Sequence, residues 1–149
     1  MSSSRRMAPL LRRAQDKQDA VARELAARQQ VLDTHTQRLG ELRQYTDEYI
    51  NAPLPAVTTG QLLNRRAFLD RLETAVRLQA QTVQRNQAHV EAERTRLLAA
   101  SRDRKVLEQL QQRYRDQEQR IADRRDQRVL DDLGARIVRV RQLDTEPLT

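Results

Sequence analysis

The sequence predicts an all-α protein in which two long helices form an antiparallel two-stranded coiled-coil hairpin. Three observations support this fold class. Ala, Leu, Gln, Arg and Glu dominate the 149 residues, whereas Gly and Pro occur only three and four times, so the composition favours helix almost throughout. Apolar residues recur at steps of three and four over long stretches. Two closely spaced prolines interrupt that pattern once and divide it into two segments.

The first helix is expected over about residues 5–52. Its apolar seam advances by alternating steps of three and four residues, and it is narrower than the stripe of a helix in a globular protein. The helix should end near Ala52, because Pro53 and Pro55 lack an amide donor and disfavour helical geometry in the residue before them. The seam positions, most of them apolar, are Leu11, Ala14, Gln18, Val21, Leu25, Arg28, Leu32, His35, Leu39, Leu42, Thr46 and Tyr49.

A loop over about residues 53–59 precedes a second helix expected over about residues 60–143. Thr58 and Gln61 have the spacing of a capping box, which marks the restart. Many positions of the second seam are polar, which predicts weak pairing. The seam comprises Leu69, Leu72, Val76, Gln79, Val83, Asn86, Val90, Glu93, Leu97, Ala100, Arg104, Leu107, Gln111, Tyr114, Glu118 and Ile121.

The phase of this seam breaks after Ile121, so the sequence also allows an interruption of helix two near 122–134. A new stripe follows at Leu130, Leu133, Ile137 and Val140. These C-terminal residues extend beyond helix one and have no partner in the predicted hairpin, which implies a binding surface, fold-back, oligomerisation or partial disorder. The whole chain, residues 1–149, is predicted to be one coiled-coil domain.

The short loop predicts that the two helices are antiparallel neighbours. If the loop is centred near residue 55, Leu42 faces Leu69 and Leu39 faces Leu72. By the same register, Leu11 lies near Ala100.

Composition and charge restrict the class of function. Only 38% of the residues are apolar and the mean hydropathy is -0.88, so a large core is not expected. The net charge of +7 comes almost wholly from Arg, but acidic residues are interleaved and no basic tail is present. These charges favour contact with an acidic protein surface over nucleic acid. A generic basic coiled-coil adaptor or a nucleic-acid-associated helix pair remains the alternative.

The sequence offers no catalytic residues, no metal site and no cofactor. Cysteine is absent, and His35 and His89 lie far apart without a metal-binding spacing, so an enzyme is not expected. Asp131 and Asp132 point to different faces of a helix. No apolar run is long enough to span a bilayer, and the N-terminal residues lack the apolar region of a signal peptide. The expected compartment is therefore the cytosol, with any membrane contact peripheral.

Three of the four aromatic residues gather at the predicted hairpin tip. There, a second stripe runs beside the seam on each helix, and the apolar face becomes wider than a two-stranded seam can bury. The aromatic rings therefore either form a surface patch that binds a partner or fill the wider end of the hairpin. The stripe comprises Arg38, Leu42, Tyr45 and Tyr49 on helix one and Phe68, Leu72, Ala75 and Gln79 on helix two.

These tip segments resemble the FliJ family of the bacterial flagellar type III export apparatus. "RLGELRQYTDEYI" is similar to a family segment of the LxxLxxYxxEY type, and "NRRAFLDRLETAVRLQ" to a following segment that is FxxxLxxAI-like. The later "VEAERTRLLAASRDRKVLEQL" also looks like the family. The resemblance covers nearly the whole chain and is strongest over residues 38–79. Arg38 and Gln79 depart from the commoner family residues.

The resemblance implies a non-enzymatic stalk similar to the central stalk of rotary ATPases. Such a stalk would sit in the hexameric flagellar export ATPase, promote ring assembly and handle flagellar export chaperones. It would contact the cytoplasmic domain of the export-gate membrane protein, and it would associate peripherally with the cytoplasmic face of the inner membrane. The gate contact maps onto the eight residues of the tip stripe. The ATPase contact would fall at the other end, where the N-terminal segment and the C-terminal extension lie.

Overall fold

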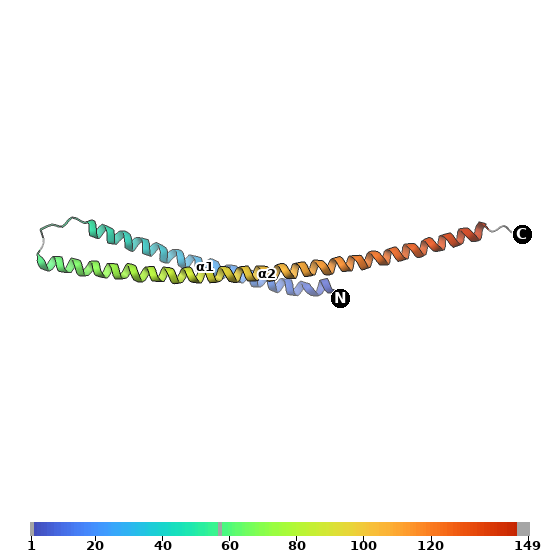
Figure 1. Ribbon diagram of the computed structural model, residues 1–149, viewed down its shortest axis with the longest axis horizontal. Helices are drawn as coiled ribbons and strands as arrows, with labels where there is room; N and C mark the ends of the chain where they lie inside the picture. The colour runs from blue at the N-terminus through green and yellow to red at the C-terminus, as the bar shows by residue number, and fades with distance from the viewer. Residues whose placement is uncertain (1, 57, 146–149) are drawn as a thin grey trace. The chain divides into compact units, whose positions relative to one another are not determined.

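The computed structural model describes residues 2–56 and 58–145, which form two long helices packed against each other (Figure 1). Helix α1 spans Ser3–Asn51 and helix α2 spans Thr59–Thr145, with 49 and 87 residues. The described residues contain no strand. The all-α prediction of two long packed helices is therefore confirmed, while the likeness to a rotary-ATPase stalk stays a prediction.

The chain divides into two compact units. One is Asp16–Arg102, which contains the hairpin turn, and the other is Met1–Gln15 together with Asp103–Thr149. The expectation of a single domain stays a prediction.

The helix boundaries follow local chemistry. At the start of α2 the backbone amide of Thr58 donates to Gln61 Oε1 at 3.0 Å, and the amide of Gln61 donates to Thr58 Oγ1 at 3.3 Å. This reciprocal pair is the capping box that the spacing predicts. Pro53 and Pro55 lie in the loop, where a missing amide donor costs no helical hydrogen bond.

Helix α2 continues without a break through residues 122–134, where the sequence also allowed an interruption. Hydrogen bonds between side chains four residues apart stabilise the helix here: Gln119 donates to Asp123 at 3.0 Å, and Gln127 donates to Asp131 at 3.1 Å. Gly134 costs a helix about 1 kcal/mol relative to Ala, which does not end it here. The change in apolar phase is thus a rotation of the stripe around one continuous helix.

The core of Asp16–Arg102 is the narrow seam between the two helices. Every predicted seam position from residue 18 to residue 49 and from residue 69 to residue 100 is buried or half-buried. The most buried side chain is Val90. The seam prediction is therefore confirmed in this unit, polar layers included: Thr46 and Glu93 are buried there, and Thr46 Oγ1 donates to the carbonyl oxygen of Leu42 at 2.7 Å.

The register differs from the prediction by about one helical turn. The side-chain amide of Gln79 donates to the carbonyl oxygen of His35 at 3.0 Å, whereas a loop centred on residue 55 would place Ala75 there. Arg65 likewise reaches the carbonyl oxygens of Tyr49 and Ile50, each at 3.0 Å. The predicted pairings of Leu42 with Leu69 and of Leu39 with Leu72 are displaced accordingly. The symmetric-loop assumption fails because the first turns of α2 extend past the last turn of α1.

In the other unit, the first turn of α1 is fixed by α2. The backbone amide of Ser4 donates to Glu118 Oε1 at 3.1 Å, and its hydroxyl donates to Glu118 Oε2 at 2.6 Å. Gln111 Nε2 donates to the carbonyl oxygen of Ser4 at 3.3 Å. A carboxylate at a helix N-terminus satisfies an orphan amide and complements the helix dipole. The hydroxyl and then the amide of Ser4 lower the pKa of the Glu118 carboxyl.

Candidate protein-binding site at the hairpin tip

The three aromatic rings of the tip form one cluster, within the Asp16–Arg102 unit. The centroids of Tyr49 and Phe68 lie 4.8 Å apart with a 59° angle between the ring planes. Tyr45 meets Phe68 edge to face, at 6.5 Å and 81°. Phe68 on α2 thus contacts both tyrosines of α1 and joins the two helices where the hairpin opens.

Arg65 holds the end of α1 against α2. One guanidinium nitrogen donates to the carbonyl oxygens of both Tyr49 and Ile50. The guanidinium carbon lies 5.3 Å from the centroid of the Tyr49 ring, within cation–π range. The last carbonyl groups of a helix lack partners within the helix, so this side chain satisfies two of them at once. Sequence reasoning missed this role, because Arg65 lies on α2 and reaches the end of α1 only across the hairpin.

The opposite end of the tip stripe is fixed by Gln79 and His35. The side-chain amide of Gln79 donates to the carbonyl oxygen of His35 and lies 3.1 Å from its Nδ1. Both side chains are half-buried at seam positions. The His35 ring is therefore held in the seam by Gln79. No group of three or more metal-ligating side chains occurs among the residues described.

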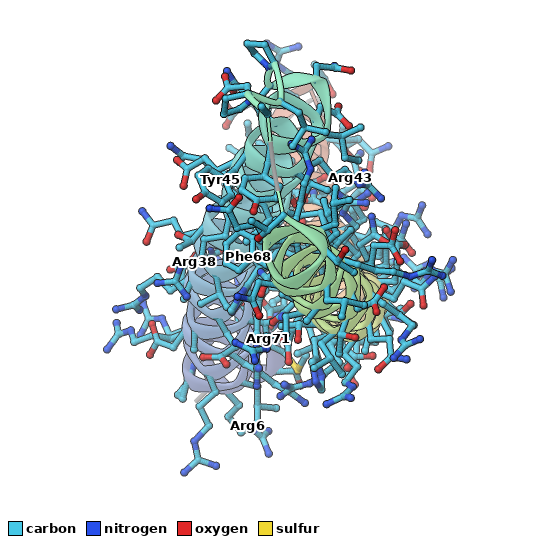
Figure 2. The ribbon with its side chains drawn as sticks, turned by 90° about the vertical axis from the view of Figure 1, so that its left-hand side faces the viewer. Arg6, Arg38, Arg43, Tyr45, Phe68 and Arg71 are labelled. Carbon is cyan, nitrogen blue, oxygen red and sulfur yellow. The ribbon has the colours of Figure 1, made fainter. Side chains whose placement is uncertain are left out.

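Four of the eight predicted stripe residues line one groove on the surface of the hairpin. Tyr45 is 50% exposed at this groove. Figure 2 shows Arg38, Tyr45 and Phe68 on one side of the helix pair, with Arg43 on the other side. The groove is lined by Arg38, Leu42, Tyr45 and Gln79, with Glu41 as a fifth residue that sequence reasoning did not name.

The remaining four residues lie at or beneath this surface rather than in the groove. Tyr49, Phe68 and Ala75 are half-buried, and Leu72 is buried in the seam. The two roles that the sequence left open for the aromatic rings are therefore divided between them. Phe68 and Tyr49 fill the wide end of the hairpin, while Tyr45 presents a half-exposed ring. That the stripe binds a partner stays a prediction.

A second groove lies elsewhere on the Asp16–Arg102 unit, and its lining residues differ in kind from those of the groove beside Tyr45. It is lined by no aromatic residue, and two arginines balance two carboxylates along it. An anchor for a protein partner is usually a large, rigid side chain such as Tyr. The groove beside Tyr45 is therefore the stronger candidate site. The lining residues of the second groove are Arg43, Thr46, Asp47, Glu73, Val76, Arg77 and Ala80.

Comparison with known proteins identifies the family. A family model described as flagellar FliJ protein matches residues 3–143. The chain belongs to the FliJ family. The matched range includes all of α1, α2 as far as residue 143, and all eight residues of the tip stripe. No match was found among curated proteins or among solved structures.

FliJ-family membership makes this chain a component of the flagellar protein export apparatus, in a structural or chaperone-like rather than a known enzymatic family. As a member of this family, the chain acts in protein transport, and its partners are expected among the other flagellar export proteins. In the part of the chain that the structure describes, neither helix contains a segment apolar and long enough to cross a bilayer.

Proposed function

We propose that this FliJ-family chain is the non-enzymatic central stalk of the hexameric flagellar export ATPase. It promotes ring assembly, links the ring to the cytoplasmic domain of the export-gate membrane protein, and handles export chaperones. It acts at the cytoplasmic face of the inner membrane as a peripheral component. The family match and the two long helices support this proposal. Its likeness to the stalk of rotary ATPases is part of the proposal.

The observation that carries the gate contact is the half-exposed Tyr45 ring in a groove at the hairpin tip. Phe68 on α2 packs against this ring and restricts its rotation. Binding a partner would therefore cost little additional side-chain entropy at Tyr45. Arg38 and Glu41 bring one charge of each sign to the groove. This arrangement of an aromatic anchor with polar neighbours is typical of protein interfaces.

The ATPase contact is assigned to the unit of Met1–Gln15 and Asp103–Thr149. There the hydrogen bonds of Ser4 with Glu118 and Gln111 hold the start of α1 on α2. A stalk that enters a ring needs the start of α1 held against α2 in this way, because ordering a frayed helix on binding would cost conformational entropy.

Calorimetric titration of the purified cytoplasmic domain of the cognate gate protein tests the tip contact. Tyr45→Ala should weaken binding by about 30-fold, the loss typical of an interface hot spot. The matched control is Leu98→Ala, since Leu98 is 59% exposed on α2 away from the tip, and it should bind as the wild type does. Equal affinity of Tyr45→Ala and wild type would refute the assignment of the groove.

A separate measurement tests the stalk role. Purified chain should stimulate ATP hydrolysis by the cognate export ATPase, and Tyr45→Ala should stimulate it as well as the wild type does. The same assay with added DNA tests the alternative of a nucleic-acid-associated helix pair. Absence of stimulation, together with DNA binding that weakens steeply with salt, would overturn the stalk proposal in favour of that alternative.

A further inference from the structure

Helix α2 carries an apolar stripe near its C-terminal end that no other part of the described chain covers. Every residue from Ile121 to Thr145 is exposed. The stripe residues recur at helical spacing and therefore share one face of the helix. Each is about half exposed or more, and the set is Val129, Leu130, Leu133, Ile137 and Val140.

Arginines border this stripe on both sides. A shallow groove on α2 is lined by Leu133, Ile137 and Val140 together with Arg136 and Arg141. At 100° per residue, Arg136 lies on one flank of the stripe and Arg141 on the other. Over residues 129–141 the chain has three arginines against Asp131 and Asp132, and at 100° per residue both aspartates lie on the far side of the helix from the stripe. Asp126 and Asp144 lie one turn beyond its two ends. The groove itself is thus apolar in the middle, with one arginine on each flank.

These arginines disfavour a second copy of this chain as the partner. In a parallel pair, each Arg136 would face Arg141 of the other copy, because the flanking positions of successive heptads meet across the seam. In an antiparallel pair centred on the stripe, Arg136 would meet Arg136 of the other copy. Like charges at these positions oppose pairing in either direction.

We propose that this stripe, Val129 to Val140, docks an amphipathic helix of another protein whose own apolar stripe is bordered by carboxylates. Apolar side chains would fill the groove along α2, and Glu or Asp side chains would pair with Arg136 and Arg141. This surface is separate from the groove beside Tyr45. It belongs to the unit to which the ATPase contact is assigned above, and the inference concerns this face of α2 whether or not that assignment holds.

Fluorescence anisotropy with the full chain and two designed helical peptides tests this inference. Both labelled peptides have Leu at the a and d heptad positions; one has Glu at e and g, and the other has Lys there. The Glu peptide should bind the chain about tenfold more tightly than the Lys peptide, the factor expected from two ion pairs at the rim of an interface. Binding of the Glu peptide should weaken as salt is raised.

Three variants locate the binding. Ile137→Asp should abolish binding of the Glu peptide, whereas Leu98→Asp should leave it unchanged; the two residues are 55% and 59% exposed. The double variant Arg136→Glu with Arg141→Glu keeps the apolar stripe and should reverse the preference, so that the Lys peptide binds more tightly. A gain of binding cannot arise from loss of folding.

Three results would overturn the proposal. The first is equal binding of the two peptides, and the second is Glu-peptide binding that survives Ile137→Asp. The third is a dimer of the chain, seen by light scattering, that Ile137→Asp dissociates, because it would make a second copy the occupant.

Discussion

Replacing the buried Glu93 by Leu should stabilise the protein. Glu93 occupies a seam position and is only 8% exposed. Its Oε1 accepts a hydrogen bond from Arg96 at 2.8 Å, but its Oε2 is buried and has no partner among the described residues. A buried polar atom without a partner is destabilising, and a polar residue in a coiled-coil seam lowers pairing strength.

The expected gain follows from three contributions. Removing the unpartnered carboxylate oxygen should contribute roughly 1–3 kcal/mol. Losing the ion pair with the mostly exposed Arg96 should cost about 0.2–1 kcal/mol. Leu and Glu have similar helix propensities, so the backbone contributes little. The net stabilisation should be about 1–2 kcal/mol, a rise in Tm of roughly 3–6 °C for a chain of this size.

Thermal and urea unfolding followed by circular dichroism at 222 nm measure this change. Glu91→Leu is the matched control, because Glu91 also pairs with an arginine three residues later on α2 but is 67% exposed in its side chain. The control should shift stability by less than about 0.5 kcal/mol. If Glu93→Leu lowers Tm, or shifts it no more than Glu91→Leu does, the argument from the unpartnered oxygen is wrong.

Three further predictions concern the tip and the start of α1. Arg65→Ala should destabilise by about 1–2 kcal/mol, because it leaves two helix-terminal carbonyl groups without their partner, and the exposed neighbour Arg66→Ala should change urea unfolding little. Phe68→Ala should cost about 2 kcal/mol in the same assay, below the cost at a fully buried site, because the ring is half-buried; an unchanged midpoint would contradict its role in joining the helices. Since the pKa of Glu118 is lowered in the folded state, its bonds with Ser4 should stabilise fully above about pH 4.5 and be lost as the pH falls through the lowered pKa. The Tm difference between wild type and Glu118→Gln should therefore shrink on acidification, and a difference that grows as the pH is lowered would refute this.

Local patterns were enough to predict which residues face the partner helix. The spacing of residues such as Val21, Leu39 and Val90 placed them in a seam, and the structure buries them. A coiled-coil seam is a one-dimensional feature: the helical period alone decides which side chains share a face. The same holds for the cap formed by Thr58 and Gln61, because both partners lie within one turn.

Contacts between the helices were not accessible in this way. The seam repeats every heptad, so a slip of about one turn leaves the apolar pattern almost unchanged, and no local pattern excludes it. The structure decides the register through side chains that reach across: Arg65 to the end of α1, Phe68 between two tyrosines, and Gln79 to His35. Each bond joins residues far apart in the chain.

The candidate site shows the same division. Sequence periodicity by itself determined that Tyr45, Tyr49 and Phe68 exceed what a two-stranded seam can bury, because that excess follows from counting apolar positions on each helix face. Only the tertiary structure decided which ring is presented. Phe68 and Tyr49 are half-buried because the register of the two helices places their rings against each other, with Arg65 over the Tyr49 ring. Tyr45 remains beside the groove. Exposure depends on how two helices are placed across the seam, and that placement is set by contacts which no local pattern records.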